Sequence, residues 1–190
     1  MSDVLKTDIN LDYDVNDSVE AFLPIYTWPK HADHLAKECN NVVVLDEKFQ
    51  LLIELMKSTI KKHNAVGLSA PQVGVHMRAL VVDLGEPRIV INPTVIHSDG
   101  EQVVNEGCLS VPGYYKDKVF PQMIHVHLLN EQGKEEVLKF EGLAAAVLQH
   151  EINHLDGITM VDSLTDEEKI EAEETVAQIL EQNPELYMLD

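Results

Sequence analysis

The pattern of hydrophobic and polar positions predicts three helices in separate segments of the chain. Apolar residues recur every three or four positions in the first segment, the second begins with an unbroken apolar run, and the third carries acidic residues in its first turns, where they suit the helix dipole. Asp46 is suited to cap the first helix, and Gly157 is suited to end the second. The three predicted helices are Asp46–His63, Leu143 to about Asp156, and Thr165 to about Gln182.

Shorter β-rich runs lie between the first and second predicted helices. Glu131-Gln132-Gly133 separates the last two runs and predicts a hairpin turn. Residues 67–74 contain two Gly and a Pro, and we expect them to form a loop. The four runs are Ala79–Asp83, Arg88–Asn92, Ile124–Leu129 and Glu136–Phe140.

The second predicted helix is apolar on all sides over residues 143–148, which predicts that it is buried. One helix before the strands and a buried helix after them indicate an α+β fold rather than repeated βαβ units. We expect short antiparallel or mixed sheets around this central helix, with further helices toward both ends of the chain. Residues 1–20 are polar and acidic and predict a flexible arm, and residues 21–190 a single catalytic domain.

The overall charge narrows the range of partners. A formal net charge of -19 argues against nucleic acid and against anionic membrane surfaces, since both require clustered Lys and Arg. The first residues lack a basic stretch followed by an apolar one, so we expect no signal or transit peptide and a cytoplasmic location in a bacterial or phage-infected cell. The two cysteines, Cys39 and Cys108, are expected to be separate thiols.

Candidate chemistry is concentrated on the buried helix. His150 and His154 are four residues apart, so both side chains leave the same face and can bind one cation. Glu151 lies one step around the helix, where a carboxylate can take a proton from a water activated by the metal. Polar residues on a buried helix are costly unless they are used, which favours a metal-dependent hydrolase.

A third ligand is needed, because catalytic sites of this kind usually have three protein ligands and one open position. Cys108 is the natural candidate, since metal coordination favours the thiolate and Gly107 permits close backbone approach. A cysteine taken alone is more often an inert buried thiol. Gln72, in the Gly- and Pro-containing segment, offers amide donors that can stabilise an oxyanion.

Three segments, taken in this order, resemble the peptide deformylase family. That family carries a Gly-x-Gly-[Leu/Ile]-Ala-Ala-x-Gln loop, a Glu-Gly-Cys-Leu-Ser segment and a Gln-His-Glu-x-Asp-His-Leu helix. The matching segments here are residues 65–72, 106–110 and 149–155. The resemblance implies hydrolytic removal of the formyl group from N-formyl-methionyl peptides, with release of formate.

The resemblance also implies a metal and its ligands. Cys108, His150 and His154 would bind one divalent ion, which is Fe²⁺ in typical members, although Ni²⁺, Co²⁺ or Zn²⁺ can take its place. Glu151 would be the general base and then pass the proton to the leaving amine.

The remaining implied roles concern the substrate. Gln72 and the backbone N–H of Leu109 would stabilise the tetrahedral oxyanion. Some residues would pair with the peptide backbone as an added strand, and others would line the methionine pocket. These substrate-binding residues are Val66, Gly67, Val104, Gly107, Leu143, Ala146 and Val147.

The chain departs from the family pattern at several positions. Ser69 replaces an Ala, Tyr115 stands where many members have Arg or another polar residue, and Asn153 replaces Asp. Phe120 replaces the Arg of a Val-x-Arg-[Pro/Ala] stretch, which here reads Lys118-Val119-Phe120-Pro121. We predict that Asn153 and Phe120 are linked, since losing one member of a buried Arg–Asp pair strands a charge and losing both is nearly neutral.

Two alternatives stay open at this point. A zinc metalloprotease of the HExxH type would take its third ligand from Glu171, Glu173 or Glu174, although it would not need the segments around Cys108 and Gln72. A catalytically inactive, metal-stabilised peptide-binding homologue would not need to retain Glu151 and Gln72.

Two expectations concern partners. We expect a monomer that acts on formylated peptides. Because the helix predicted over residues 165–182 is acidic, it could meet a ribosome only at a basic protein patch, and simple packing of this helix is favoured.

Overall fold

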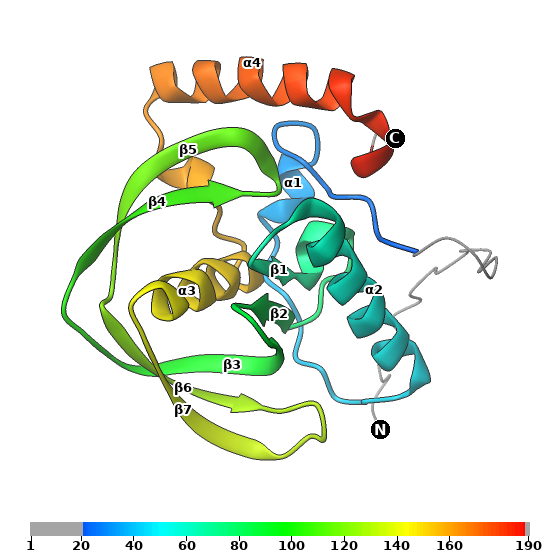
Figure 1. Cartoon of the computed structure of the whole chain (residues 1–190), viewed down its shortest axis with the longest axis vertical. Helices are drawn as coiled ribbons and strands as arrows, with labels where there is room; N and C mark the ends of the chain where they lie inside the picture. The colour runs from blue at the N-terminus through cyan, green and yellow to red at the C-terminus, as the bar shows by residue number, and fades with distance from the viewer. Residues whose placement is uncertain (1–20, 189–190) are drawn as a thin grey trace.

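The computed structural model describes residues 21–188, which form an α+β fold (Figure 1). The arm predicted over residues 1–20 lies outside this range. The helices are α1 (Ala32–Leu35), α2 (Glu47–His63), α3 (Leu143–Leu155) and α4 (Asp166–Gln182). The strands are β1 (Gly67–Ser69), β2 (Ala79–Asp83), β3 (Pro87–Asp99), β4 (Gln102–Cys108), β5 (Val111–Phe120), β6 (Met123–Leu129) and β7 (Glu135–Glu141). Three short 3₁₀ helices are Ala70–Val73, Met160–Ser163 and Pro184–Leu186.

Two antiparallel sheets enclose α3. The larger has the strand order β1-β2-β3-β6-β7, and β4 pairs with β5 in a separate two-stranded sheet. Figure 1 shows α3 between the β4–β5 hairpin and the strands β3, β6 and β7. The α+β prediction is confirmed, and the central helix is the one that carries both histidines.

The predicted helices are found with nearly the expected ends. Asp46 caps α2 by accepting a hydrogen bond from Phe49 N at 3.0 Å, and Thr165 caps α4 by accepting one from Glu168 N at 3.2 Å. The all-round burial predicted for α3 is wrong at its beginning, where Leu143 is 55% exposed. The reason lies in the cleft described below, which leaves one side of this turn open.

Several strand predictions require correction. Residues 67–74 do not form a loop: β1 pairs Leu68 with Val81 of β2, and a 3₁₀ helix follows. The run from Arg88 is the beginning of a longer strand that continues to Asp99 and pairs with β6. The hairpin of β4 and β5 was not predicted as a pair of strands, since its sequence contains residues that are rare in strands, such as Gly and Asp.

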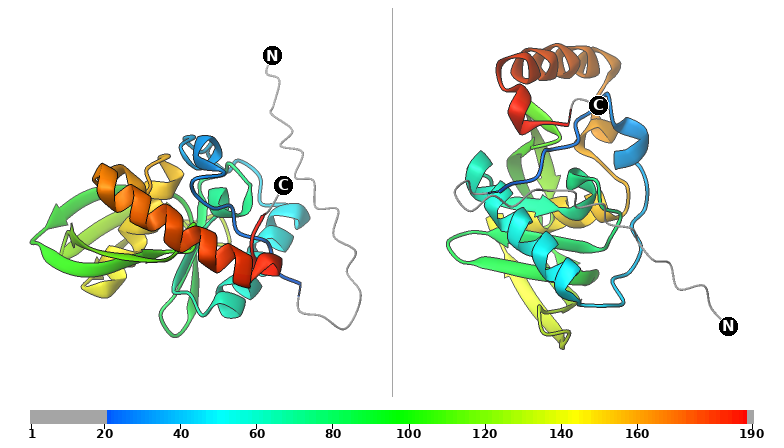
Figure 2. Two further views of the ribbon diagram at one scale, coloured as in Figure 1. Left: turned by 90° about the horizontal axis from the view of Figure 1, so that it is seen from above. Right: turned by 90° about the vertical axis from the view of Figure 1, so that its right-hand side faces the viewer.

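The C-terminal segment packs against β5 and returns to the beginning of the described chain (Figure 2). Ala172 and Val176 of α4 are buried in a cluster with Val111 of β5, so this acidic helix packs its apolar face onto the domain. Beyond α4, Ile25 N donates to Leu186 O at 3.1 Å and Met188 N donates to Ile25 O at 2.8 Å. No helix within residues 21–188 combines the length and apolar character needed to cross a membrane.

Candidate metal centre

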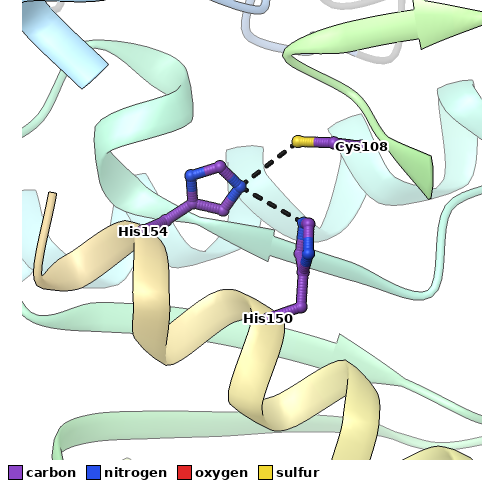
Figure 3. Close-up of side chains that lie close together, drawn as sticks. All are labelled: Cys108, His150 and His154. Atoms are coloured by element: carbon purple, nitrogen blue, oxygen red, sulfur yellow. Dashed lines mark hydrogen bonds between the residues drawn. The ribbon is translucent and has the colours of Figure 1, made fainter. Parts of the chain in front are cut away.

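Three predicted ligands converge where α3 faces the end of β4 (Figure 3). His154 Nε2 lies 3.2 Å from Cys108 Sγ and 3.2 Å from His150 Nε2. The helical spacing places the two imidazoles one turn apart on one face, and the irregular pairing of β4 after Gly107 turns the thiol toward them. Cys108 and His154 are buried, and the side chain of His150 is 12% exposed.

The donor set fits a divalent metal ion. Each imidazole nitrogen offers one proton or one lone pair, so His154 Nε2 cannot satisfy both neighbours well through hydrogen bonds alone. Two imidazoles and a thiolate are common ligands of catalytic metals and leave one position open. Within residues 21–188, no other three His, Cys, Asp or Glu side chains bring ligand atoms within 4.8 Å of one another. The glutamates that a protease would need, on α4, are therefore not part of the site.

Glu106 orients one of the ligands, a role that the sequence did not reveal. Its Oε1 lies 2.6 Å from His150 Nδ1 and accepts a hydrogen bond from Lys118 Nζ at 3.2 Å. Although burial acts in the opposite direction, these two partners hold the pKa of Glu106 below its ordinary value. A carboxylate at Nδ1 leaves Nε2 of His150 free to bind a metal.

Glu151 is buried beside the ligands, with a side chain that faces the backbone of β1. A Cβ atom added at Gly67 would lie 2.5 Å from Glu151 Oε1, so the glycine makes room for the carboxylate. Burial raises the pKa of Glu151 to about 7, although the charge of His150 and a hydrogen bond with Ser69 act in the opposite direction. A carboxyl group with a pKa near neutrality can both accept and return a proton.

Gln72 is held in one orientation at the edge of the site. Its Oε1 accepts hydrogen bonds from the backbone N and the hydroxyl of Ser69, each at 2.9 Å. Its Nε2 therefore points the other way, 3.5 Å from Cys108 Sγ and 3.3 Å from Ser110 Oγ. Ser69 is one of the departures from the family pattern, and here its hydroxyl adds a second bond that fixes the amide.

A cavity of about 460 Å³ opens in front of these groups. His154 is not part of the lining and lies behind it. Gln72, Cys108, Leu109, His150 and Glu151 line this cleft. All seven residues predicted to bind substrate also line it, namely Val66, Gly67, Val104, Gly107, Leu143, Ala146 and Val147.

Other lining residues were missed by sequence reasoning. His63 comes from the end of α2, whereas Ile179 and Tyr187 come from α4 and the segment after it. No motif marks these residues, because the packing of elements that are distant in sequence brings them to the cleft.

The other departures have specific surroundings. Tyr115, predicted near the substrate entrance, lines the cleft and is 64% exposed, with its ring against Gly107. Asn153 accepts a hydrogen bond from Gln149 Nε2 at 3.0 Å, and Phe120 is buried beside the cleft. The proposed link between Asn153 and Phe120 stays a prediction.

Comparisons with known proteins find relatives that cover most of the chain. The family model described as "Polypeptide deformylase" matches residues 22–170. A peptide deformylase of Neisseria meningitidis serogroup B is 41% identical over 150 residues, which cover 76% of this chain and 88% of the relative. The crystal structure of a peptide deformylase from Legionella pneumophila matches with a TM-score of 0.81 and 35% identity, covering 86% of this chain and 98% of that one. A peptide deformylase from Ehrlichia chaffeensis in complex with actinonin matches with a TM-score of 0.75 and 31% identity, covering 85% and 98%.

Proposed function

This chain belongs to the peptide deformylase family of metal-dependent hydrolases, which remove the formyl group from N-terminal formylmethionine. From this premise, we propose the role of each site residue in the reaction. We propose Fe²⁺ as the native metal, on the basis of the family, since the ligand types alone do not select one ion. When bound, a divalent ion would lower the pKa of a water molecule from about 15.7 toward about 7 and polarise the formyl carbonyl.

Glu151 is proposed to move the proton during hydrolysis. Its carboxylate takes a proton from the attacking water and then gives it to the nitrogen of the departing methionine, so that formate and a free amine result. The observation that carries this proposal is the position of Glu151, buried beside the ligands with a pKa raised to about 7.

Gln72 and the backbone N–H of Leu109 are proposed to stabilise the oxyanion that forms on the formyl carbon. The two bonds from Ser69 direct the Gln72 amide nitrogen toward the metal centre, so little reorientation is needed when charge develops. Leu109 directly follows Cys108 and lines the same cleft, which supports a role for its backbone N–H beside the metal.

The peptide is proposed to lie between β1 and β4 as an added strand, paired with the backbones of Val66, Gly67 and Gly107. The methionine side chain would then enter the part of the cleft lined by α3. Leu143 supports this placement, because an apolar side chain that is 55% exposed inside a cleft is suited to an apolar group of the substrate. The pocket residues would be Val104, Leu143, Ala146 and Val147, with Val66 at its edge.

We further propose that residues 21–190 act as one catalytic domain, as a monomer in the cytoplasm, on formylated nascent peptides. The packing of α4 against β5 favours a structural role for this acidic helix over a ribosome contact. The Ehrlichia relative was solved in complex with actinonin, and we expect the same inhibitor to bind in this cleft.

The roles are tested by measuring formate release from formyl-Met-Ala-Ser with anaerobically prepared protein of known metal content. We expect Glu151→Gln to keep its metal and to lose at least about a thousandfold in kcat/KM, since the proton loses its carrier. A Glu151→Gln variant with nearly full activity would assign the proton transfer to another group.

A further inference from the structure

Glu106 links a cation to a metal ligand through a single oxygen. Its Oε1 lies 3.2 Å from Lys118 Nζ and 2.6 Å from His150 Nδ1. The carboxylate is 4% exposed and the Lys118 side chain 24%, so the pair lies mostly out of water. A buried carboxylate is retained at low cost only when its charge is matched and its oxygens are hydrogen-bonded.

The strand register explains how Lys118 reaches this position. In the β4–β5 hairpin, Lys118 is opposite Val104, two residues from Glu106, and this diagonal distance can be spanned by a long side chain. Lys118 and Phe120 are two residues apart on β5, so their side chains lie on the same face. The Lys118 ammonium is 5.2 Å from the centre of the Phe120 ring.

The position of the cation differs from the family pattern. The family's Val-x-Arg stretch has its positive charge where this chain has Phe120, and a Val where this chain has Lys118. The basic residue and the apolar residue have therefore changed places along one face of the strand. The positive charge on this face has therefore moved by two residues and has not been lost.

We propose that Lys118 is a positioning residue for His150, which it holds by fixing the Glu106 carboxylate against the imidazole. This inference rests on the metal site of the proposed function. Glu106 sets the ring orientation and the tautomer of His150, as carboxylates behind metal-binding histidines commonly do. Within the described residues, His154 Nδ1 has no hydrogen-bond partner, so the pair of imidazoles depends on the support at His150.

The competing account is that Lys118 forms an ordinary partly exposed ion pair of little consequence. Lys116 provides a matched control. It lies two residues earlier on the same face of β5, has a similar exposed fraction of 28%, and pairs with Glu168 of α4 at 2.6 Å instead of with Glu106. Loss of either lysine removes one cation and one ion pair from the same strand.

The experiment measures how fast Ni²⁺ leaves the loaded protein in excess chelator, with melting temperature as the measure of folding. We expect Lys118→Val to release the metal about tenfold faster than the wild type, within the range seen when support behind a ligand is lost. Lys116→Val should stay within about twofold of the wild type, because its partner does not touch the site.

A rescue variant completes the design. Lys118→Arg keeps a cation at the same place, so we expect it to retain the metal within about threefold of the wild type. Metal release from Lys118→Val at the wild-type rate, equal acceleration in Lys116→Val, or failure of Lys118→Arg to restore retention would each overturn the inference.

Formate release separates this inference from the proposed function. A wild type that deformylates normally while Lys118→Val keeps its metal would overturn the role of Lys118 alone. A wild type without formate release, but with faster metal loss in Lys118→Val, would overturn the proposed roles and leave the positioning role intact.

Discussion

The wall of the cleft that carries the metal ligands is held by hydrogen bonds between buried polar groups, whereas the wall formed by the C-terminal segment is held by apolar packing. On the first wall, Glu106, Gln72 and Glu151 are each fixed by named partners or by a close backbone. On the second, Ile179 packs against Gly113 and joins an apolar cluster. We propose from this difference that the first wall sets the chemistry and that the second affects how much of the peptide is bound.

The largest effect expected on the first wall is at its thiol ligand. Cys108→Ala removes the only sulfur of the donor set, and we expect metal content after dialysis to fall by more than about tenfold and formate release to be lost with it. Glu171→Ala serves as the control, because this α4 residue is one of the three that a protease could have used as its third ligand. Metal loss in Glu171→Ala but not in Cys108→Ala, measured by elemental analysis, would contradict the assigned ligand set.

A second large effect is expected at the oxyanion donor. Gln72→Ala should retain the metal and reduce kcat by about 10² to 10³, the usual cost of removing one preorganised donor. Ser69→Ala removes only one of the two bonds to Gln72 Oε1, so its loss should be about fivefold, in line with one net hydrogen bond. A larger loss in Ser69→Ala than in Gln72→Ala would show that Ser69 acts on something other than the amide.

Gly67→Ala tests how closely the first wall is fitted. The added Cβ would lie 2.5 Å from Glu151 Oε1, and the carboxylate would have to move. We expect kcat/KM to fall about 10²-fold, since displacement of a catalytic group by about 1 Å has effects of that size. Metal content should change little, while the melting temperature should fall, because the added methyl group crowds a buried side chain even though Gly67 has no positive φ. An unchanged kcat/KM would mean that the rate of deformylation does not depend on the exact position of the Glu151 carboxylate.

The two walls also differ in how far the sequence predicts them. The metal ligands and Glu151 follow from helical spacing and from short contiguous segments, so local geometry alone brings most of them together. The position of Lys118 beside Glu106 becomes evident only from the register of β4 against β5. The position of Ile179 in the cleft becomes evident only from the path of the chain after α3. Such contacts depend on residues distant in sequence, which periodicity does not encode.

The same reasoning explains the errors in the fold. Capped, periodic helices such as α2 were predicted nearly to the residue, since their hydrogen bonds are local. The strand β1 has three residues and exists because it pairs with β2, so no pattern within residues 67–74 could reveal it. Leu143 was predicted to be buried from its apolar neighbours, but exposure is decided by what packs around a helix.

The smallest expected effect, and the one that most directly tests the second wall, is at Ile179. Ile179→Ala removes apolar surface from the cleft at a distance from the chemistry, so kcat should be unchanged while KM for a formylated hexapeptide rises about fivefold, equivalent to about 1 kcal/mol of apolar contact. KM for formyl-Met-Ala should rise less than twofold, because we expect this short peptide to end before the second wall. Leu180→Ala is the matched control, since this neighbour is also partly buried on α4 but does not line the cleft. Both substitutions lower stability, so the melting temperature can fall in both. Only Ile179→Ala should raise KM more for the long peptide than for the short one. Equal KM changes for the two peptides would remove the second wall from substrate binding and leave it a purely structural part of the fold.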